Sequence, residues 1–317
     1  MSDHINASQT KAGFVAIIGA PNAGKSTLLN SLLAHKLAVV SPKVQTTRTN
    51  IRGVLTQGNV QYVFVDTPGI HDPRRTFDKA MVQAAWQALT DADVVLFVLD
   101  GIKGFDKQAK QLLANLKKEQ NLPPVHLVVN KIDKVAKTNL LPLMAQAAKE
   151  GVFKEVVPLS ALKIKEKEKQ TILELLAKEL PESPYLYDEE TLTDMPSRLW
   201  AAEATRERAF LLLGEELPYS LSVETLSFDT LDNGSLELHQ NIYIERDGQK
   251  KIVVGKNGQM LKKIGEQARK GMENMFDTRV HLFVQVKVRP NWASDIHHMR
   301  MLGLEQKSGQ KATKKGS

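Results

Sequence analysis

The sequence contains no cysteine among its 317 residues. It can therefore form no disulfide, no thiolate metal site and no cysteine nucleophile, which agrees with a reducing cytoplasm. Long hydrophobic runs are also missing: runs such as VVLFVLD from Val94 fall far short of the roughly 20 residues that cross a bilayer. No basic-then-apolar leader opens the chain, so we expect a cytoplasmic protein. With 42% hydrophobic and 25% charged residues, the composition is that of a soluble globular protein.

Basic residues are scarce in one part of the chain, and acidic residues are fewer than basic ones in the part that follows it. Residues 181–244 hold 3 Lys and Arg against 13 Asp and Glu, whereas residues 245–317 hold 16 against 7. The net charge of +7 and the pI near 9.3 favour an anionic partner, and the distribution places a basic segment after an acidic one. Solvated faces of mixed sign are the alternative explanation.

The first half alternates apolar runs with amphipathic stretches. Strands are expected at FVAIIG from Phe14, VQYVFVDT from Val60, VVLFVLD from Val94, VHLVVN from Val125 and EVVPLS from Glu155. Strand and helix in alternation predict a mostly parallel α/β sheet with helices on both faces. Functional loops should then leave the carboxyl ends of the strands.

One of these loops, GAPNAGKST, has the complete phosphate-loop spacing between a strand and a helix. Backbone N–H groups of such a loop point at phosphates, Lys25 reaches the outer two, and the Ser26 hydroxyl is a ligand for Mg²⁺. The predicted nucleotide-binding residues here are Gly19, Ala20, Pro21, Asn22, Ala23, Gly24, Lys25, Ser26 and Thr27.

Three further motifs follow in an order typical of guanine nucleotide-binding domains. DTPG places the Asp66 carboxylate near Mg²⁺ and Gly69 as a hinge toward the terminal phosphate. NKID lets Asp133 accept two hydrogens from the guanine edge, a pairing that adenine cannot offer, and SAL closes the purine pocket. The predicted residues are Asp66, Thr67, Pro68, Gly69, Asn130, Lys131, Asp133, Ser160, Ala161 and Leu162. We therefore expect GTP and GDP as ligands and Mg²⁺ as cofactor.

The hydrolysis step raises finer questions. One of Thr46 and Thr47 should complete the Mg²⁺ shell formed with Ser26 and Asp66, and Thr47 is favoured. Ile70 stands where Ras-like proteins place the glutamine that orients the attacking water. An aliphatic side chain cannot orient that water. His71 is nearby, but a loop histidine is more often solvated. The expected catalytic residues are Lys25, Asn22, Thr47 and Gly69.

The second half begins after LPESPYLYDEETLTDMPS, a proline-rich acidic stretch expected to be a linker. A helix, two strands joined near LDNGS, the loop GKNG, an amphipathic helix and a strictly alternating strand VHLFVQVKV follow. GKNG lacks the spacing and hydroxyl of a second triphosphate site, and by itself would be a turn. Its basic, amphipathic neighbours favour a KH arrangement, in which such a loop grips single-stranded RNA. The predicted RNA-binding residues are Gly255, Lys256, Asn257, Gly258, Ile252, Val254, Leu261, Lys262 and Lys263.

Together the motifs GAPNAGKST, QTTR, DTPGIH, NKID and SAL, with VVGKNGQMLKKIGEQARKGMENMF and VKVRPNWASD, resemble the bacterial Era family over nearly the whole chain. The resemblance implies a P-loop GTPase domain joined to a smaller α+β type II KH domain. It implies binding to the 3′ end of 16S ribosomal RNA, help in maturation of the 30S subunit, and sometimes peripheral association with the inner membrane. It also implies hydrolysis without a glutamine and aided by K⁺, with Asn22 beside the ion. Nothing demands more than a monomer.

The expected organisation is a flexible N-terminus at 1–10, a GTP-binding domain at 11–180, a linker at 181–197, a KH domain at 198–304 and a disordered basic tail at 305–317. Two rival functions stay open. A tRNA-modifying GTPase shares the TTR and Ile-after-Gly features but ends in a cysteine-bearing motif. A nucleotide-binding scaffold at the membrane or in the cell cycle would need no turnover.

Overall fold

The structure, a computed structural model, describes residues 10–40, 47–69, 76–214, 217–295, 299 and 304. Several expectations concern residues outside this set: the flexibility of the N-terminus before residue 10, a Mg²⁺ ligand at Thr46, the roles of Ile70 and His71, and the basic tail. They stay predictions.

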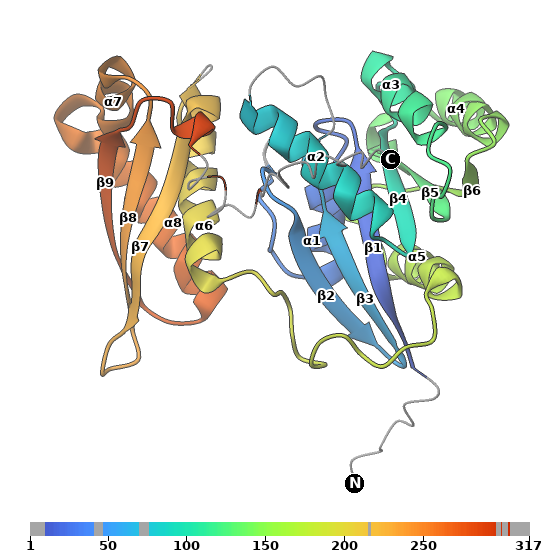
Figure 1. Ribbon diagram of the computed structural model, residues 1–317, viewed down its shortest axis with the longest axis horizontal. Coiled ribbons are helices and arrows are strands. Elements are labelled where there is room, and N and C mark those ends of the chain that lie inside the picture. The colour runs from blue at the N-terminus through green and yellow to red at the C-terminus, as the bar shows by residue number, and fades with distance from the viewer. Residues whose placement is uncertain are drawn as a thin grey trace, which may run out of the picture.

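The first half folds around a six-stranded sheet in the order β2-β3-β1-β4-β5-β6 (Figure 1). All neighbours are parallel except β2, which pairs antiparallel with β3. The five expected strands are present, and β2, which had not been expected, is the sixth. The strands are β1 Lys11–Gly19, β2 Ile51–Gln57, β3 Val60–Asp66, β4 Val94–Asp100, β5 Val125–Asn130 and β6 Phe153–Pro158.

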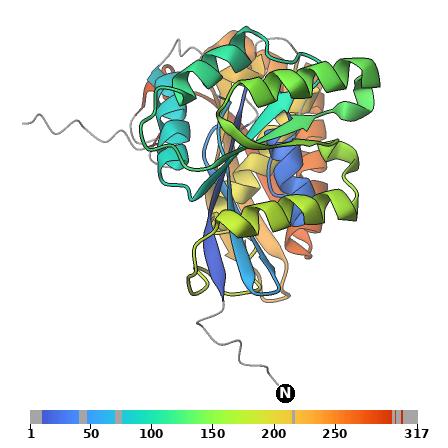
Figure 2. The ribbon, with the colours of Figure 1, turned by 90° about the vertical axis from the view of Figure 1, so that its right-hand side faces the viewer.

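Helices cover both faces of this sheet, as expected from the alternating pattern (Figure 2). Apolar side chains of α1 and α5 pack with Val15, Ile17 and Phe64 on one face, and those of α2, α3 and α4 pack with Ala16, Ile18 and others on the opposite face. The bounds are α1 Lys25–Leu33, α2 Thr76–Thr90, α3 Lys107–Leu116, α4 Lys137–Lys149 and α5 Glu166–Glu179. Strands β3, β4 and β5 are buried along their whole length, which explains why they are almost entirely apolar, with Gln61 and His126 as buried polar exceptions.

The second half is a three-stranded sheet, β7-β8-β9, with α6, α7 and α8 on one face (Figure 1). Strands β7 and β8 are antiparallel, and β8 and β9 are parallel. The bounds are α6 Ser197–Leu212, β7 Leu221–Thr230, β8 Leu236–Ile244, α7 Asp247–Val254, α8 Gln259–Phe276 and β9 Val280–Val288. This α+β unit is the expected smaller second domain.

The segment between the two halves is held along the first sheet. Glu182 forms a β-bridge with Lys11, and the carbonyl of Leu192 accepts a hydrogen bond from Val54 N of β2. The fully buried Gln61 of β3 accepts from Leu186 N and Tyr187 N at 2.8 and 3.0 Å and donates to Tyr187 O at 2.8 Å. The predicted boundaries at 180 and 198 stay predictions, and the structure adds that the expected linker is anchored to β2 and β3.

The two halves also pack against each other through side chains. Phe77, Ala80 and Met81 of α2 form an apolar cluster with Tyr243 of β8, Trp292, Ala293, Met299 and Leu304. Lys36 also forms an ion pair of 2.7 Å with Glu207 of α6. Among the described residues, no helix is long and apolar enough to cross a membrane.

Candidate functional site: a nucleotide cavity and a separate GxxG loop

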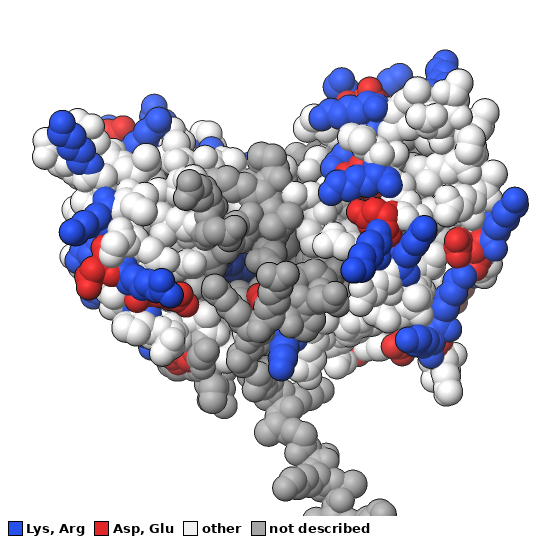
Figure 3. Space-filling view, turned by 90° about the horizontal axis from the view of Figure 1, so that it is seen from above, with Lys and Arg blue, Asp and Glu red and all other residues white. Residues whose placement is uncertain are grey.

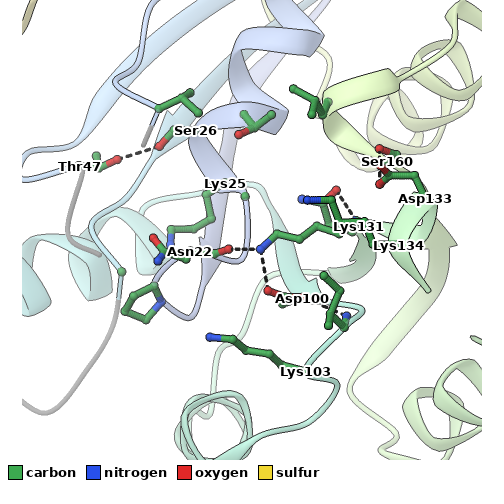
Figure 4. Close-up of a pocket in the computed structure, with 18 of the residues that line it drawn as sticks. Asn22, Lys25, Ser26, Thr47, Asp100, Lys103, Lys131, Asp133, Lys134 and Ser160 are labelled. Atoms are coloured by element: carbon green, nitrogen blue, oxygen red, sulfur yellow. Dashed lines mark hydrogen bonds and ion pairs between the residues drawn. The ribbon is translucent and has the colours of Figure 1, made fainter. Parts of the chain in front are cut away.

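A cavity of about 550 Å³ opens at the carboxyl ends of the parallel strands, where ligands bind in open α/β sheets (Figure 4). Most of the predicted nucleotide-binding residues meet there. The cavity is lined by Pro21, Asn22, Gly24, Lys25, Ser26, Thr27, Val39, Val40, Thr47, Gly69, Asp100, Ile102, Lys103, Asn130, Lys131, Asp133, Lys134, Ser160 and Leu162.

The phosphate loop leads directly into α1. Gly24 has φ +100, and a Cβ there would lie 2.1 Å from Nδ2 of Asn130, so only glycine fits. Helix α1 begins at Lys25, and no side chain caps its N-terminus. Its first backbone N–H groups, which have no partners within a helix, are therefore suited to bind phosphate oxygens.

Lys25 lies within this loop. Its Nζ donates to the carbonyls of Gly19 and Ala20, both at 3.1 Å, and the residue is buried. Burial lowers the pKa of Lys25 to about 8, and the nearby Asp66 carboxylate opposes that shift. A phosphate beside Lys25 would act in the same direction as Asp66 and favour the charged ammonium.

Three oxygen-bearing side chains meet beside the phosphate loop: Ser26 and Thr47 line the cavity, whereas Asp66 is fully buried and does not line it. The Ser26 and Thr47 hydroxyls donate to Asp66 Oδ2 at 2.6 and 2.9 Å, and their own oxygens lie 2.9 Å apart. Burial raises the pKa of Asp66, whereas Lys25 and the two hydroxyls lower it. Asp66 Oδ1 is buried and has no hydrogen-bond partner in the described part of the chain. Hydroxyl and carboxylate oxygens are the ligands that Mg²⁺ prefers, so these residues fit the ion.

Asn130 connects the phosphate loop to the base side of the cavity. Its Nδ2 donates to Ala23 O at 2.9 Å, and its Oδ1 accepts from Lys131 N and Ala161 N at 2.7 and 2.8 Å. Asn130 therefore fixes two loops relative to each other.

Asp133 lies at the far end of the cavity from the phosphate loop (Figure 4). Ser160 Oγ donates to Asp133 Oδ1 at 2.8 Å, and Lys163 Nζ lies 3.5 Å from Oδ2. The Ser160 hydrogen bond, more than the lysine, lowers the pKa of Asp133. The carboxylate stays ionised and can accept two hydrogen bonds from N1–H and N2–H of guanine.

Sequence reasoning missed Asp100, which the structure places between the two sides. Lys131 Nζ donates to Asp100 Oδ2 and to Asn22 O, both at 2.6 Å, so it connects β4 and β5 with the phosphate loop. Asp100 ends a parallel strand, as Asp66 and Asn130 do, and that position could have identified it. Val39, Val40, Ile102, Lys103 and Lys134 also line the cavity and carried no motif.

Some predicted nucleotide-binding residues lie beside the cavity and do not line it. Thr67 is fully buried, and its hydroxyl donates to Ile17 O at 2.9 Å, which ties β3 to β1. Gly19, Ala20, Ala23 and Ala161 act through their backbone atoms. Pro68 precedes Gly69, whose Cα faces Pro21 so closely that a Cβ would lie 3.0 Å from Pro21 Cα.

The predicted RNA-binding residues form a second, separate site. Gly255, Lys256, Asn257 and Gly258 form the turn between α7 and α8, and both Lys256 and Asn257 are exposed. Ile252 is 56% exposed, whereas Val254 and Leu261 are half-buried at the edge of the second core. Lys262 and Lys263 are exposed on the first turn of α8. None of these residues lines the nucleotide cavity.

Comparisons with known proteins match both sites. A family model described as a 50S ribosome-binding GTPase matches residues 14–131, and a KH domain model matches residues 216–293. GTPase Era of Afipia carboxidovorans is 46% identical over 296 residues, covering 93% of this chain and 95% of that protein. GTPase Era of Rhizobium meliloti is likewise 46% identical over 296 residues and covers 93% of each chain.

The chain belongs to the Era family of GTPases. Two solved Era structures agree with a TM-score of 0.88 at 39% identity, and each covers 94% of this chain and 100% of its own. One is an Aquifex aeolicus variant bound to GDP and AlF₄⁻, and the other is bound to MgGDPNP and nucleotides 1506–1542 of 16S ribosomal RNA. The resemblance to Era is thus confirmed, and the tRNA-modifying alternative is not supported by these full-length matches.

As an Era-family GTPase, the protein hydrolyses GTP to GDP and phosphate. Bound Mg²⁺ would supply positive charge to the phosphate oxygens as the bond to the terminal phosphate breaks. Ser26, Thr47 and Asp66 would hold the ion. Lys25 and the N–H groups at the start of α1 would stabilise charge on the phosphates, and Asp133 is placed to accept hydrogen bonds from guanine.

Proposed function

We propose that this family member binds the 3′ end of 16S ribosomal RNA through the turn between α7 and α8 and assists maturation of the 30S subunit. The observation that carries the proposal is the exposed Lys256 in a GxxG turn of a KH domain. An Era relative similar along the whole chain is bound to nucleotides 1506–1542 of that RNA, which supports the same partner here.

The turn has room for a nucleic acid backbone. Gly255 has φ +71 and a Cβ there would lie 2.7 Å from Met260 Cβ, whereas apart from its own chain neighbours no described residue has an atom within 4 Å of a Cβ built on Gly258. Asn257 is left-handed at φ 51, which turns the chain at once into α8. A phosphate can therefore approach the backbone N–H groups at the N-terminus of α8, with Lys256 beside it.

The surroundings of the turn suit single-stranded RNA. Ile252 offers an exposed apolar surface for bases, and Val254 and Leu261 border it. Lys262 and Lys263 add positive charge for the following phosphates. Viewed from the end of the molecule that carries α7, lysine and arginine side chains are prominent over both domains (Figure 3).

The test replaces Lys256 with glutamate in the full chain. We expect RNA carrying the 16S 3′ end to bind at least about tenfold more weakly, because one phosphate contact is lost and a repulsive charge is added. The slope of log K against log salt should fall by roughly 0.7. Lys178→Glu, the same change on the exposed side of α5, is the matched control and should change neither quantity.

GTP hydrolysis at low RNA concentration should be unchanged in Lys256→Glu, because Lys256 does not line the nucleotide cavity. If RNA binding survives this change, the RNA site lies elsewhere. Crosslinking in cell extract, with and without a GTP analogue, should recover mainly small-subunit ribosomal RNA. Recovery of mainly tRNA would overturn the proposed partner.

We also propose that K⁺ assists hydrolysis at Asn22. This residue lines the cavity in the phosphate loop, with its backbone left-handed at φ 64 and its carbonyl held by Lys131 Nζ. Its side-chain oxygen would be a ligand for a cation bound beside the phosphates in this cavity. Such a cation would supply the charge that an arginine finger supplies elsewhere.

We propose finally that the protein acts as a cytoplasmic monomer whose nucleotide state changes how the KH domain meets RNA. Peripheral attachment to the inner membrane stays part of this proposal, and it would occur through surface contacts. Fractionation of cells and sedimentation at several concentrations would test location and monomer state.

A further inference from the structure

Arg48, the residue after Thr47, reaches from the nucleotide domain into the KH domain. It is only 4% exposed, and its Nη1 donates to the carbonyl of Leu221, the first residue of β7, at 2.6 Å. Its guanidinium carbon lies 5.7 Å from the ring centre of Phe77 on α2 and 5.6 Å from that of Trp292. A single side chain thus contacts α2, β7 and the segment after β9.

These contacts stabilise the positive charge of the Arg48 guanidinium, which burial disfavours. Burial, with the nearby Arg206, lowers the pKa of Arg48 to about 9, while Glu203 and Asp78 oppose the shift. A buried cation is stable only where acceptors and aromatic faces replace its water. Loss of the Leu221 carbonyl and the Trp292 ring, both presented by the KH domain, should therefore disfavour this position of Arg48.

Trp292 is itself fixed on the KH side. Its indole Nε1 donates to Ser220 O at 3.0 Å, its ring meets that of Phe77 edge-on at 5.7 Å, and it is 1% exposed. Trp292 is thus fixed relative to the start of β7, and the two together form the surface that the Arg48 guanidinium contacts.

The preceding side chain points the other way, into the metal site. Thr47 Oγ1 lies 2.9 Å from both Ser26 Oγ and Asp66 Oδ2. Adjacent Cα atoms are about 3.8 Å apart, so Arg48 cannot shift far without moving Thr47. We propose that Arg48 is a positioning residue for GTP hydrolysis, through which the KH domain holds Thr47 at the Mg²⁺ site.

The consequence is a preference for one nucleotide. In GTPases, contacts to Mg²⁺ and the terminal phosphate order the loop that carries this threonine, and hydrolysis releases it. Holding Thr47 in place beforehand should therefore favour Mg²⁺-bound GTP over GDP. This inference depends on the GTPase chemistry and not on the identity of the RNA.

The test uses the full chain with substitutions on both sides of the contact. We measure the affinities for a non-hydrolysable GTP analogue and for GDP in Mg²⁺, together with kcat for GTP. Trp292→Leu, which does not touch the cavity, should weaken analogue binding about tenfold, the size of one buried cation–π contact, and should leave GDP binding within about twofold. Arg48→Lys, which keeps the charge but loses the planar group, should act in the same direction and also lower kcat.

Two further variants separate positioning from general damage. Trp292→Phe keeps an aromatic face and should restore most of the preference for the GTP analogue. Lys36→Ala removes another contact between the domains, the ion pair with Glu207, and should leave the ratio of the two affinities unchanged. An unchanged ratio in both Trp292→Leu and Arg48→Lys would overturn the proposal. An equal loss of GDP and analogue affinity would also overturn it, because that result indicates only structural damage.

Discussion

The anchored linker leads to a prediction about Gln61. Its side chain makes three hydrogen bonds with the backbone of Leu186 and Tyr187, and it is fully buried in β3. Replacing it with leucine, which has nearly the same volume, removes these three bonds and a fourth, from Nε2 to Thr56 Oγ1 at 3.1 Å, without leaving a large cavity. Each neutral hydrogen bond contributes about 1 kcal/mol, so the free energy of unfolding of the first domain should fall by about 4 kcal/mol.

The assay combines urea unfolding with limited chymotrypsin digestion. In the variant, Tyr185, Leu186 and Tyr187 should be cleaved before either domain is degraded, because the linker leaves the sheet locally. Gln57→Leu is the matched control, since Gln57 is an exposed residue of β2 bonded to Gln170. It should change stability by less than about 0.5 kcal/mol.

The result that would refute this reasoning is a Gln61→Leu protein with the stability and cleavage pattern of the Gln57→Leu control. It would mean that water replaces the four hydrogen bonds of Gln61 at no net cost. The linker would then be positioned only by the β-bridge at Lys11 and the bonds to β2.

Three other outcomes are expected. Asp133→Asn should weaken GDP binding by about a hundredfold, measured by calorimetry. It should improve binding of xanthosine diphosphate, whose base offers a carbonyl to the new amide. The control, Lys163→Gln, should change GDP binding less than threefold. Hydrolysis by the unmodified protein should be faster in KCl than in NaCl, and Asn22→Ala should make the two rates equal; equal rates before the substitution would remove K⁺ from the mechanism. His126 is 2% exposed and burial lowers its pKa from 6.5, so the folded state binds fewer protons than the unfolded state below about pH 6.5. Stability should therefore fall on acidification by up to about 1.4 kcal/mol per pH unit, thermal unfolding of His126→Gln should show a weaker dependence, and His239→Gln, at an exposed site, should behave like the parent.

The parts of the fold that sequence reasoning predicted are those with strong local signals. Buried parallel strands appear as continuous apolar runs, and the phosphate loop has fixed glycine positions, as at Gly24 with φ +100. Strand β2, in contrast, contains Arg52 and Gly53 and lies at the edge of the sheet. Its pairing with β3 and the linker, and not its composition, makes it a strand.

The GxxG turn shows a different limit. The run IVV before Gly255 has the β-branched composition of a strand, yet it ends helix α7, in which only Val253 is buried. Its tertiary position against β9 and α8 outweighs local propensity. The turn itself was recognisable because two glycines frame a lysine at the start of a basic amphipathic helix.

No local sequence pattern indicated the contacts between distant segments. Arg48 stands in a motif that predicts a metal ligand next to it, and nothing near it in the sequence indicates Leu221 or Trp292 as its neighbours. The ion pairs made by the acidic segment at residues 181–244 are likewise visible only in the structure. Within it, Glu203 pairs with Arg206, and Glu207 pairs with Lys36 and Arg208.

The apolar cluster between α2 and the KH domain limits how such proteins can be recombined. Phe77 and Met81 are covered by Tyr243 and Trp292 and are at most 6% exposed. A different RNA-binding domain joined after the linker would leave these side chains in water unless it brought a matching surface. Substitutions at Phe77 and Trp292 should therefore be inherited together, and chimeras of family members should fold best when α2 is exchanged along with the KH domain.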